Sequence, residues 1–383
     1  MINHSRPETT YKNIFFSFFN DGDCRETLQD DLTRYFGVSK IIFTQSARSG
    51  LYFLLKSLPH KKVFIPSYTC SVVAEAAKLA NKEIVFIDIR LNDYNMNVEL
   101  LQEKIIPHSI IIATHQFGIP CDIEDIIKIA EANQCYVIED NAMAFGSEYK
   151  GKKTGSFAGA SVISFDLSKT LVGGRGGAIL FNDEKLFEKV KMLFDKDSVD
   201  SGLFFAGKVL LLTLATKFCT EKFIYGAVNF FFRKRENFTI DAPISNQTLS
   251  KEFYLNKLDD RFMKLAFLNF QRILKIITRR NEISTIYFNS FKDSLEFDLP
   301  SYQNYKTSVF MRFPVLVKGK SKSDYYLNKN KKGLNMGFVF PYSCDANKKN
   351  SPNAYIVASS VLNIPLNSCL SDSDILKIIS IIK

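Results

Sequence analysis

The ten residues from Ser161 to Thr170 read SVISFDLSKT, and the run GGRGG follows from Gly173 to Gly177. The first part is apolar and rich in β-branched side chains, which is typical of a buried strand. The expected strand ends in a polar turn that carries Lys169. A lysine amine that loses part of its hydration beside a buried strand can form a Schiff base. An ordinary surface lysine is the alternative, and the rest of the chain has to decide between the two.

The composition is that of an ordinary globular protein. A chain of 383 residues has room for two domains, or for one large domain with a smaller one appended. Seven scattered cysteines without a C-x-x-C pair favour reduced thiols in a cytoplasmic protein over a metal site or disulfide framework. Residues 1–8 are polar and lack a signal-peptide core. The net charge of +10 indicates either a compositional habit of the genome, which we favour, or attraction to anionic substrates or a membrane face. We expect no nucleic-acid partner.

Short apolar runs alternate with helical patterns through the first half of the chain. The runs lie at 40–44, 63–65, 83–88, 109–114, 135–138, 161–164 and 178–181. This alternation predicts an α/β domain with a buried, largely parallel sheet, and such sheets bind ligands beyond the carboxyl ends of their strands. The polar residues expected at those ends are Arg48, Tyr68, His115, Asp140 and Ser164. The small polar residues around Ala47 and Arg48 also precede a helix, whose free amides suit a phosphate group.

The second half of the chain has a different character. Residues 203–232 are very apolar and aromatic, and basic residues close the segment at 233–235. We favour helices packed in the core or at a subunit interface, and the alternative is a helix lying in a membrane surface. The pattern over 255–283 predicts one long helix that leads to a smaller domain, which contains a strand at 308–317. The expected division is an irregular segment 1–25, a large domain 26–250 with the apolar insert 203–232, and a linking helix with a small C-terminal α+β domain over 251–383.

Nine motifs along the chain, taken in order, resemble those of the DegT/DnrJ/StrS family of pyridoxal-phosphate (PLP) sugar aminotransferases. They are Ser46–Leu51, Pro66–Cys70, Ile87–Ile89, His115–Pro120 with Asp122, Glu139–Ala144, Tyr149–Gly151 with Gly155–Ser156, Ser164–Lys169, Gly174–Gly177 and Ile364–Leu366. Each motif alone is weak, but the ordered set covers most of the chain. The resemblance implies PLP-dependent transferase fold type I, as in aspartate aminotransferase: a large, mixed, mostly parallel sheet domain and a small C-terminal domain.

The resemblance also implies a role for each matching residue. Lys169 corresponds to the lysine that forms the Schiff base with PLP. Asp140 corresponds to the carboxylate that keeps the ring nitrogen of PLP protonated, although a helix N-cap is its structural alternative. Ala47, Arg48 and Ser164 correspond to the residues that bind the phosphate.

Several positions depart from the family pattern. Cys70 stands where the family has an aromatic residue that stacks on the PLP ring, and Met143 replaces a glutamine that contacts the phenolic oxygen. Arg175 replaces a glutamate near the sugar site. The family's Asn-x-Arg element, which reaches across the dimer, has no clear counterpart in 240–250, where Asn246 is a weak candidate. These departures indicate a divergent branch of the family.

The function implied is transfer of an amino group, from glutamate, to a nucleotide-linked keto-sugar for surface polysaccharide or lipopolysaccharide (O-antigen) synthesis. The family's fold implies a homodimer, and contact with the inner membrane face through 203–235 is the alternative to a purely cytoplasmic location. Two other functions remain open: a non-catalytic PLP-binding scaffold, and a PLP-dependent sugar dehydratase, whose members carry histidine where this chain has Lys169. His115 could contact cofactor or substrate, or it could only hydrogen-bond the protein.

Overall fold

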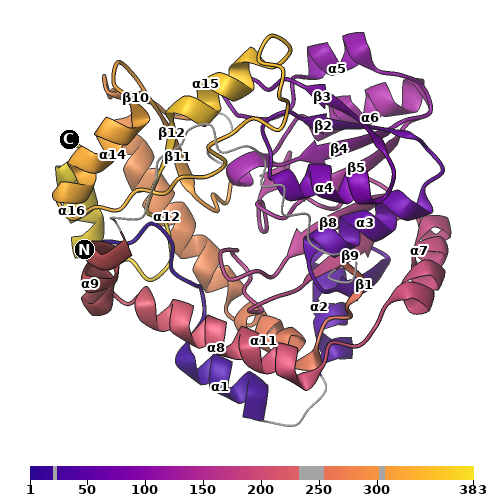
Figure 1. Cartoon of the computed structure of the whole chain (residues 1–383), viewed down its shortest axis with the longest axis horizontal. Helices are drawn as coiled ribbons and strands as arrows, with labels where there is room; N and C mark the ends of the chain where they lie inside the picture. Colours follow the sequence, from indigo (N-terminus) through magenta and orange to yellow (C-terminus); the bar gives the residue numbers. More distant parts are fainter. Residues whose placement is uncertain (20–23, 233–253, 302–306) are drawn as a thin grey trace.

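The computed structural model describes residues 1–19, 24–232, 254–301 and 307–383. The basic residues 233–235 and the segment 240–250, in which we sought the Asn-x-Arg element, therefore lie outside the described residues. A large domain built on a seven-stranded sheet occupies one side of the molecule, and the C-terminal elements occupy the other (Figure 1).

The central sheet is mostly parallel, as the sequence predicts. Its strand order is β1 (Lys40–Thr44), β9 (Gly177–Phe181), β8 (Ala160–Ser164), β5 (Tyr136–Asp140), β4 (Ile110–Thr114), β2 (Lys62–Pro66) and β3 (Glu83–Ile87). Only β9 runs against its neighbours, since it pairs antiparallel with both β1 and β8. The parallel strands β2, β4, β5 and β8 therefore end at one common edge, where ligands bind in sheets of this kind.

Helices cover both faces of the sheet, because alternate strand residues point to opposite sides. Ile110 and Ile112 of β4 pack in the cluster that contains α3 (Ala47–Ser57), α4 (Ser71–Leu79) and α7 (Glu184–Asp197). Their neighbours on the strand pack against the other layer. That layer consists of α5 (Val98–Lys104), the short 3-10 helix η1 (Gln116–Gly118), α6 (Ile123–Ala132) and the hairpin β6 (Glu148–Tyr149) and β7 (Lys152–Lys153), with α2 (Arg25–Phe36) and α11 (Asp260–Phe270) beyond them.

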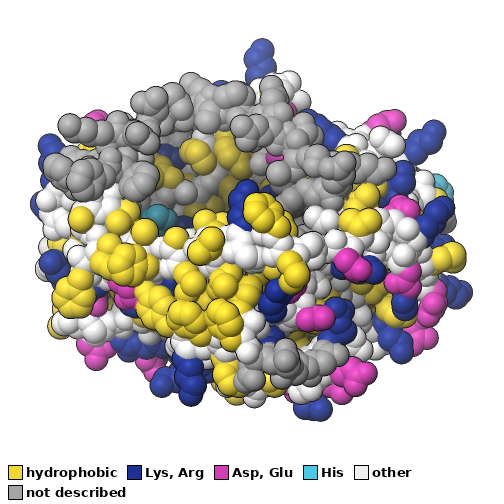
Figure 2. Space-filling model, turned by 60° about the horizontal axis from the view of Figure 1, so that its bottom comes forward, with side chains coloured by type: hydrophobic (Ala, Val, Ile, Leu, Met, Phe, Trp, Pro, Cys, Tyr) yellow, Lys and Arg dark blue, Asp and Glu magenta, His cyan; other side chains and the backbone are white. Residues whose placement is uncertain are grey.

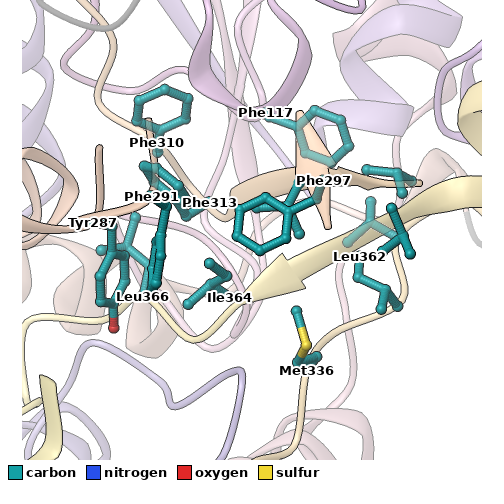
Figure 3. Close-up of a cluster of buried hydrophobic side chains, with 14 of the residues drawn as sticks. Phe117, Tyr287, Phe291, Phe297, Phe310, Phe313, Met336, Leu362, Ile364 and Leu366 are labelled. Atoms are coloured by element: carbon teal, nitrogen blue, oxygen red, sulfur yellow. The ribbon is translucent and has the colours of Figure 1, made fainter. Parts of the chain in front are cut away.

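The small domain has a three-stranded antiparallel sheet of its own. Its elements are α12 (Ile273–Phe291), β10 (Phe297–Asp298), β11 (Phe313–Val317), α14 (Lys322–Lys331), α15 (Pro352–Ser360), β12 (Val361–Ile364) and α16 (Asp372–Ile382). Aromatic side chains fill the space between α12 and this sheet, and Phe117 reaches into the same cluster from the large domain (Figure 3). One shared apolar cluster therefore joins the two domains.

Three expectations about the elements were wrong. Residues 1–25 are not irregular throughout, because α1 (Tyr11–Phe19) forms there and buries Ile14 against the large domain. The expected helix over 255–283 is divided into α11 and α12, with a break at Gln271 and Arg272. The expected strand at 308–317 starts only at Phe313, because the guanidinium of Arg280 takes the carbonyl oxygens of the two preceding residues 310 and 311.

The N-terminal segment is tied to the C-terminal part of the chain. Ile2 forms an isolated parallel bridge with Leu334. The carboxylate of Glu8 is buried, and it accepts a hydrogen bond from Arg280 at 2.5 Å and another from the backbone N–H of Ser368 at 2.8 Å. The first eight residues are therefore part of the small domain.

The apolar insert forms two helices, α8 (Leu203–Cys219) and α9 (Lys222–Phe232). One side of α8 is buried through Ala206, Val209 and Thr213, while the opposite side stays exposed. Among the described residues, a membrane-spanning stretch is not found in any single helix; α8 and the start of α9 reach the required length only together, and they are bent by 95°.

Candidate active site

A cavity of about 470 Å³ opens at the carboxyl ends of the parallel strands, between the two domains. The large domain supplies most of its lining, and the small domain closes the other side with Met311, Arg312, Phe338, Val339, Phe340 and Tyr342. Seven of the eight predicted site residues line this cavity: Lys169, Asp140, Ala47, Arg48, Ser164, Cys70 and Met143. Residues up to 122 positions apart in sequence therefore meet where the sheet topology places a ligand.

Lys169 extends from a tight turn directly after β8. Its backbone N–H donates a hydrogen bond to the carbonyl of Asp166 at 3.0 Å. The carboxylate of Asp166 in turn accepts hydrogen bonds from the backbone N–H and the hydroxyl of Ser168, at 3.2 and 3.3 Å. These bonds fix the backbone on which the lysine stands, so its amine points from a rigid support.

The glycine-rich run beside this turn allows close backbone packing. A Cβ on Gly177 would lie 2.5 Å from the backbone nitrogen of Ala47 and 2.5 Å from the carbonyl oxygen of Ile163. Only glycine fits there without a shift of the backbone. The run therefore holds β9 against the start of α3, and it also places Arg175 at the cavity wall, with its guanidinium 5.7 Å from the ring centre of Phe205 in α8.

Asp140 is the last residue of β5, and its carboxyl group is buried. Burial raises the pKa of this carboxyl above its ordinary value, while a hydrogen bond from the Ala142 backbone N–H, at 3.1 Å, and the nearby charge of Lys169 act in the opposite direction. A buried carboxylate that faces the cavity gains from a cationic partner there. The protonated ring nitrogen of PLP is such a partner.

The first turn of α3 offers donors for an anion. Ser46 is the N-cap of α3, and its hydroxyl accepts the N–H of Ser49 at 3.2 Å. Ala47 and Arg48 are the first two helical residues, and backbone N–H groups at these positions have no partner within the helix. With the hydroxyl of Ser164 on the adjacent strand, this side of the cavity fits a dianionic phosphate.

Cys70 and Met143 form part of the wall but cannot reproduce what the family has there. Burial raises the pKa of the Cys70 thiol, which keeps it neutral and makes it a small apolar surface. Met143 is buried and offers no hydrogen-bond donor. Phe340 and Tyr342 of the small domain line the same cavity and supply aromatic surface from the opposite side. The hydroxyl of Tyr342 accepts the N–H of Ser71 at 3.2 Å, which ties this wall to α4.

His115 is the predicted site residue that does not line the cavity. Its Nδ1 accepts the backbone N–H of Cys121 at 3.1 Å, and its Nε2 lies 3.0 Å from a carboxylate oxygen of Glu139. An accepting Nδ1 requires the tautomer in which Nε2 carries the proton and donates it to Glu139. These contacts match the structural alternative for this histidine.

Sequence reasoning missed two features of this region. Glu139 is fully buried beside Asp140, and its carboxylate also accepts backbone N–H groups of Gly155, Phe157 and Ala158 at 2.7, 2.7 and 2.9 Å. Burial acts to raise the pKa of this carboxyl, but the hydrogen bonds hold it below its ordinary value. The second feature is Arg312, and its signal in the sequence was a single charge inside the apolar run 308–317.

The residues around the cavity fit PLP. One lysine stands on a fixed turn, one buried carboxylate faces it, and a helix start with a hydroxyl and an arginine provides for the phosphate. The comparisons with known proteins agree with this fit. The profile of the DegT/DnrJ/EryC1/StrS aminotransferase family matches residues 12–207, which is just over half of the chain. This protein belongs to that family, whose cofactor is PLP; solved neighbours include PLP and PMP forms.

Relatives at the level of the sequence include sugar-modifying enzymes. An uncharacterized protein of Methanocaldococcus jannaschii, MJ1066, is 25% identical over 91% of this chain and 86% of its own length. GDP-perosamine synthase of Escherichia coli O157:H7 is 36% identical, over 33% of this chain and 35% of the enzyme. The chain thus aligns with only about a third of the length of this named relative.

Solved structures share the whole fold. The aminotransferase TlmJ of Streptoalloteichus hindustanus superposes with a TM-score of 0.78 and 19% identity, covering 100% of this chain and 98% of that chain. At this identity the likeness concerns the fold, which is the type I fold that the sequence predicts.

Proposed function

We propose that this protein is a PLP-dependent aminotransferase that moves an amino group from glutamate to a nucleotide-linked keto-sugar, for surface polysaccharide or lipopolysaccharide synthesis. The products are 2-oxoglutarate and an amino-sugar nucleotide. The observation that carries the proposal is the placement of Lys169, Asp140 and the start of α3 around one cavity. The naming of relatives such as GDP-perosamine synthase supports the class of acceptor.

Each residue has a defined task in this reaction. PLP, when bound, supplies a ring that withdraws electrons from the carbon next to the transferred nitrogen. Asp140 would keep the ring nitrogen protonated by placing its carboxylate against it. Arg48, Ser164 and the amides of α3 would hold the phosphate. The amine of Lys169 would anchor the cofactor and then move the proton that leaves one substrate carbon and returns to another.

Absorbance and substitution of Lys169 test the proposal together. The purified protein with PLP should show a near-visible band, glutamate should abolish it, and keto-sugar nucleotides should restore it. Lys169→Ala should lose the linkage and amino transfer while keeping the fold. Amino transfer by the Lys169→Ala protein at the rate of the unaltered protein would overturn the proposal.

Two other functions are distinguished by the same experiment. Cys70, Met143 and Arg175 depart from the family pattern, so a scaffold that binds PLP without turnover is the second candidate. It would show the absorbance band and no response to glutamate with any acceptor. A sugar dehydratase would release deoxygenated sugar without amino transfer, and Lys169 in place of a histidine speaks against it.

We also propose that the active form is a homodimer. The support is the family's fold, in which subunits share the active site, together with a cavity that reaches the molecular surface. Light scattering coupled to size-exclusion chromatography measures the mass directly. A fully active monomer of about 43.7 kDa would refute the proposal.

A peripheral contact with the inner membrane face, through 203–235, is a further part of this proposal. Its described part, α8 and α9, lies beside α1, and hydrophobic side chains gather on this face of the molecule (Figure 2). Phe19, Phe204 and Phe223 are 74%, 89% and 97% exposed. The sequences of α1, α8 and α9 contain lysines and no acidic residue, a pattern that suits anionic lipid headgroups.

Sedimentation with vesicles tests this contact. Vesicles containing anionic lipid should carry the protein down, and Phe204→Ser together with Phe223→Ser should release it while PLP binding stays intact. If the double variant instead changes a dimer into a monomer and vesicles never bind, the surface belongs to a second copy of the chain and the membrane proposal is wrong.

A further inference from the structure

The small domain places one arginine at the cavity without a protein partner. Arg312 directly precedes β11 and lines the cavity, whereas Lys169 stands on the large domain. Its Nε is enclosed and has no hydrogen-bond partner, and no carboxylate of the described residues lies within ion-pair distance of its guanidinium. A partly buried guanidinium without a partner is costly, so its retention points to a group that arrives from outside.

The neighbours of Arg312 do not neutralise its charge. Arg280 is nearby, but its own charge is taken up by Glu8 and by the carbonyl oxygens of residues 310 and 311. His4 lies against Arg312 across Gly337, where an added Cβ would meet the His4 ring at 2.8 Å and Nη1 of Arg312 at 3.3 Å. Burial and the charge of Arg312 lower the pKa of His4 to about 3, so this histidine is neutral.

The same surroundings weaken the charged form of Arg312 itself. Burial and the charge of Arg280 lower the pKa of the Arg312 guanidinium to about 10, although Asp166 acts in the opposite direction without forming an ion pair. At neutral pH the group is still a cation. An incoming anion would therefore gain a full positive charge in a poorly solvated position, where charge-assisted hydrogen bonds are strong.

We propose that Arg312 binds a carboxylate of the amino-acid donor and so makes the small domain the donor-recognition side of the cavity. The planar fork of a guanidinium matches a carboxylate with two parallel hydrogen bonds. The phosphate has its own donors at the start of α3, which belong to the large domain. An amino acid has its carboxylate one bond from the reacting carbon, so a second anion site within the same cavity as Lys169 suits it. This inference rests on the proposed function.

Substitution of Arg312 should affect the donor half of the reaction alone. In the PLP-loaded protein, glutamate removes the near-visible band, and the glutamate dependence of that change gives its apparent affinity. Arg312→Gln should weaken this affinity about 10- to 100-fold, as expected for loss of charge-assisted hydrogen bonds. Arg312→Lys keeps the charge without the fork and should give a smaller loss. The keto-sugar nucleotide half-reaction should stay within about threefold of the unaltered protein.

Two controls complete the design. Arg279→Gln removes a neighbouring arginine on the outer surface, where it pairs with Asp372 and Glu282, and should change neither half-reaction. Calorimetric titration with glutarate, which has two carboxylates and no amine, tests the subsite without turnover; Arg312→Gln should weaken or abolish its binding. PLP absorbance and thermal unfolding report whether each variant is folded.

The outcomes separate the two proposals. If the unaltered protein binds PLP but never reacts with glutamate, the proposed function fails, while glutarate binding still tests Arg312. If Arg312→Gln is folded and binds glutarate and glutamate as before, the donor subsite is refuted. If only the sugar half-reaction suffers, the anion that Arg312 binds belongs to the acceptor, and the inference is likewise wrong.

Discussion

Replacing Glu139 with glutamine tests how the carboxylate next to the site is held. One carboxylate oxygen accepts the N–H groups of Phe157 and Ala158, and the other accepts those of Gly155 and His115. A glutamine amide places an NH₂ group where one oxygen was, so two donors lose their acceptor. Loss of two hydrogen bonds to a charged group, at about 1.5–3 kcal/mol each, predicts a fall of about 3–6 kcal/mol in the free energy of unfolding.

Thermal and denaturant unfolding measure this loss. With an unfolding entropy of about 2.1 cal/mol/K per residue, a chain of 383 residues should lose roughly 4–7 °C in its midpoint. Glu124→Gln is a matched control, because Glu124 is exposed and pairs only with Lys150, so it should cost less than about 1 kcal/mol.

The pH dependence gives a second test of the same reasoning. The pKa of the Glu139 carboxyl is lowered in the folded protein, so its stabilisation is present above the unfolded pKa of about 4.5 and is lost as the pH falls through the lower folded value. Glutamine does not titrate. The stability gap between the two proteins should therefore narrow in acid. A loss below about 1 kcal/mol at neutral pH, or a gap that stays constant into acid, would refute the account of Glu139.

Three other substitutions have expected outcomes. Asp140→Asn should leave PLP bound and lower single-turnover amino transfer at least about 100-fold, because an amide does not hold the ring nitrogen protonated; transfer within threefold of normal would exclude that role. Gly177→Ala should destabilise the fold by more than about 2 kcal/mol in urea unfolding, since its Cβ meets backbone atoms at 2.5 Å, whereas Gly207→Ala in open space on α8 should be neutral or slightly stabilising. Arg280→Gln should cost about 3–5 kcal/mol in the same assay by leaving the Glu8 carboxylate buried without its cation, and a change under 1 kcal/mol would contradict this.

The large domain was predictable because its signals are local. Each parallel strand is a continuous apolar run, and the topology of such sheets brings the ends of β2, β4, β5 and β8 to one edge without knowledge of any contact. The cavity residues Lys169 and Asp140 follow from that rule.

The errors came from contacts between distant parts of the chain. The side chain of Arg280 removes carbonyl groups that a longer β11 would use, and nothing around residue 310 announces it. Arg312 is equally hidden, because its lack of a partner is visible only when residues 4, 280 and 337 are placed around it. A sequence pattern records which faces are apolar, but not which charges remain unpaired after folding.

The contacts of the first eight residues have a consequence for synthesis of the protein. Ile2 pairs with Leu334, and Glu8 bonds groups 272 and 360 positions away along the chain. During translation the N-terminus emerges first, yet its partners are among the last residues to leave the ribosome. The beginning of the chain must therefore wait, unpaired, until the end arrives. The small domain closes late, and an N-terminal fusion or truncation should slow maturation before it alters the finished fold.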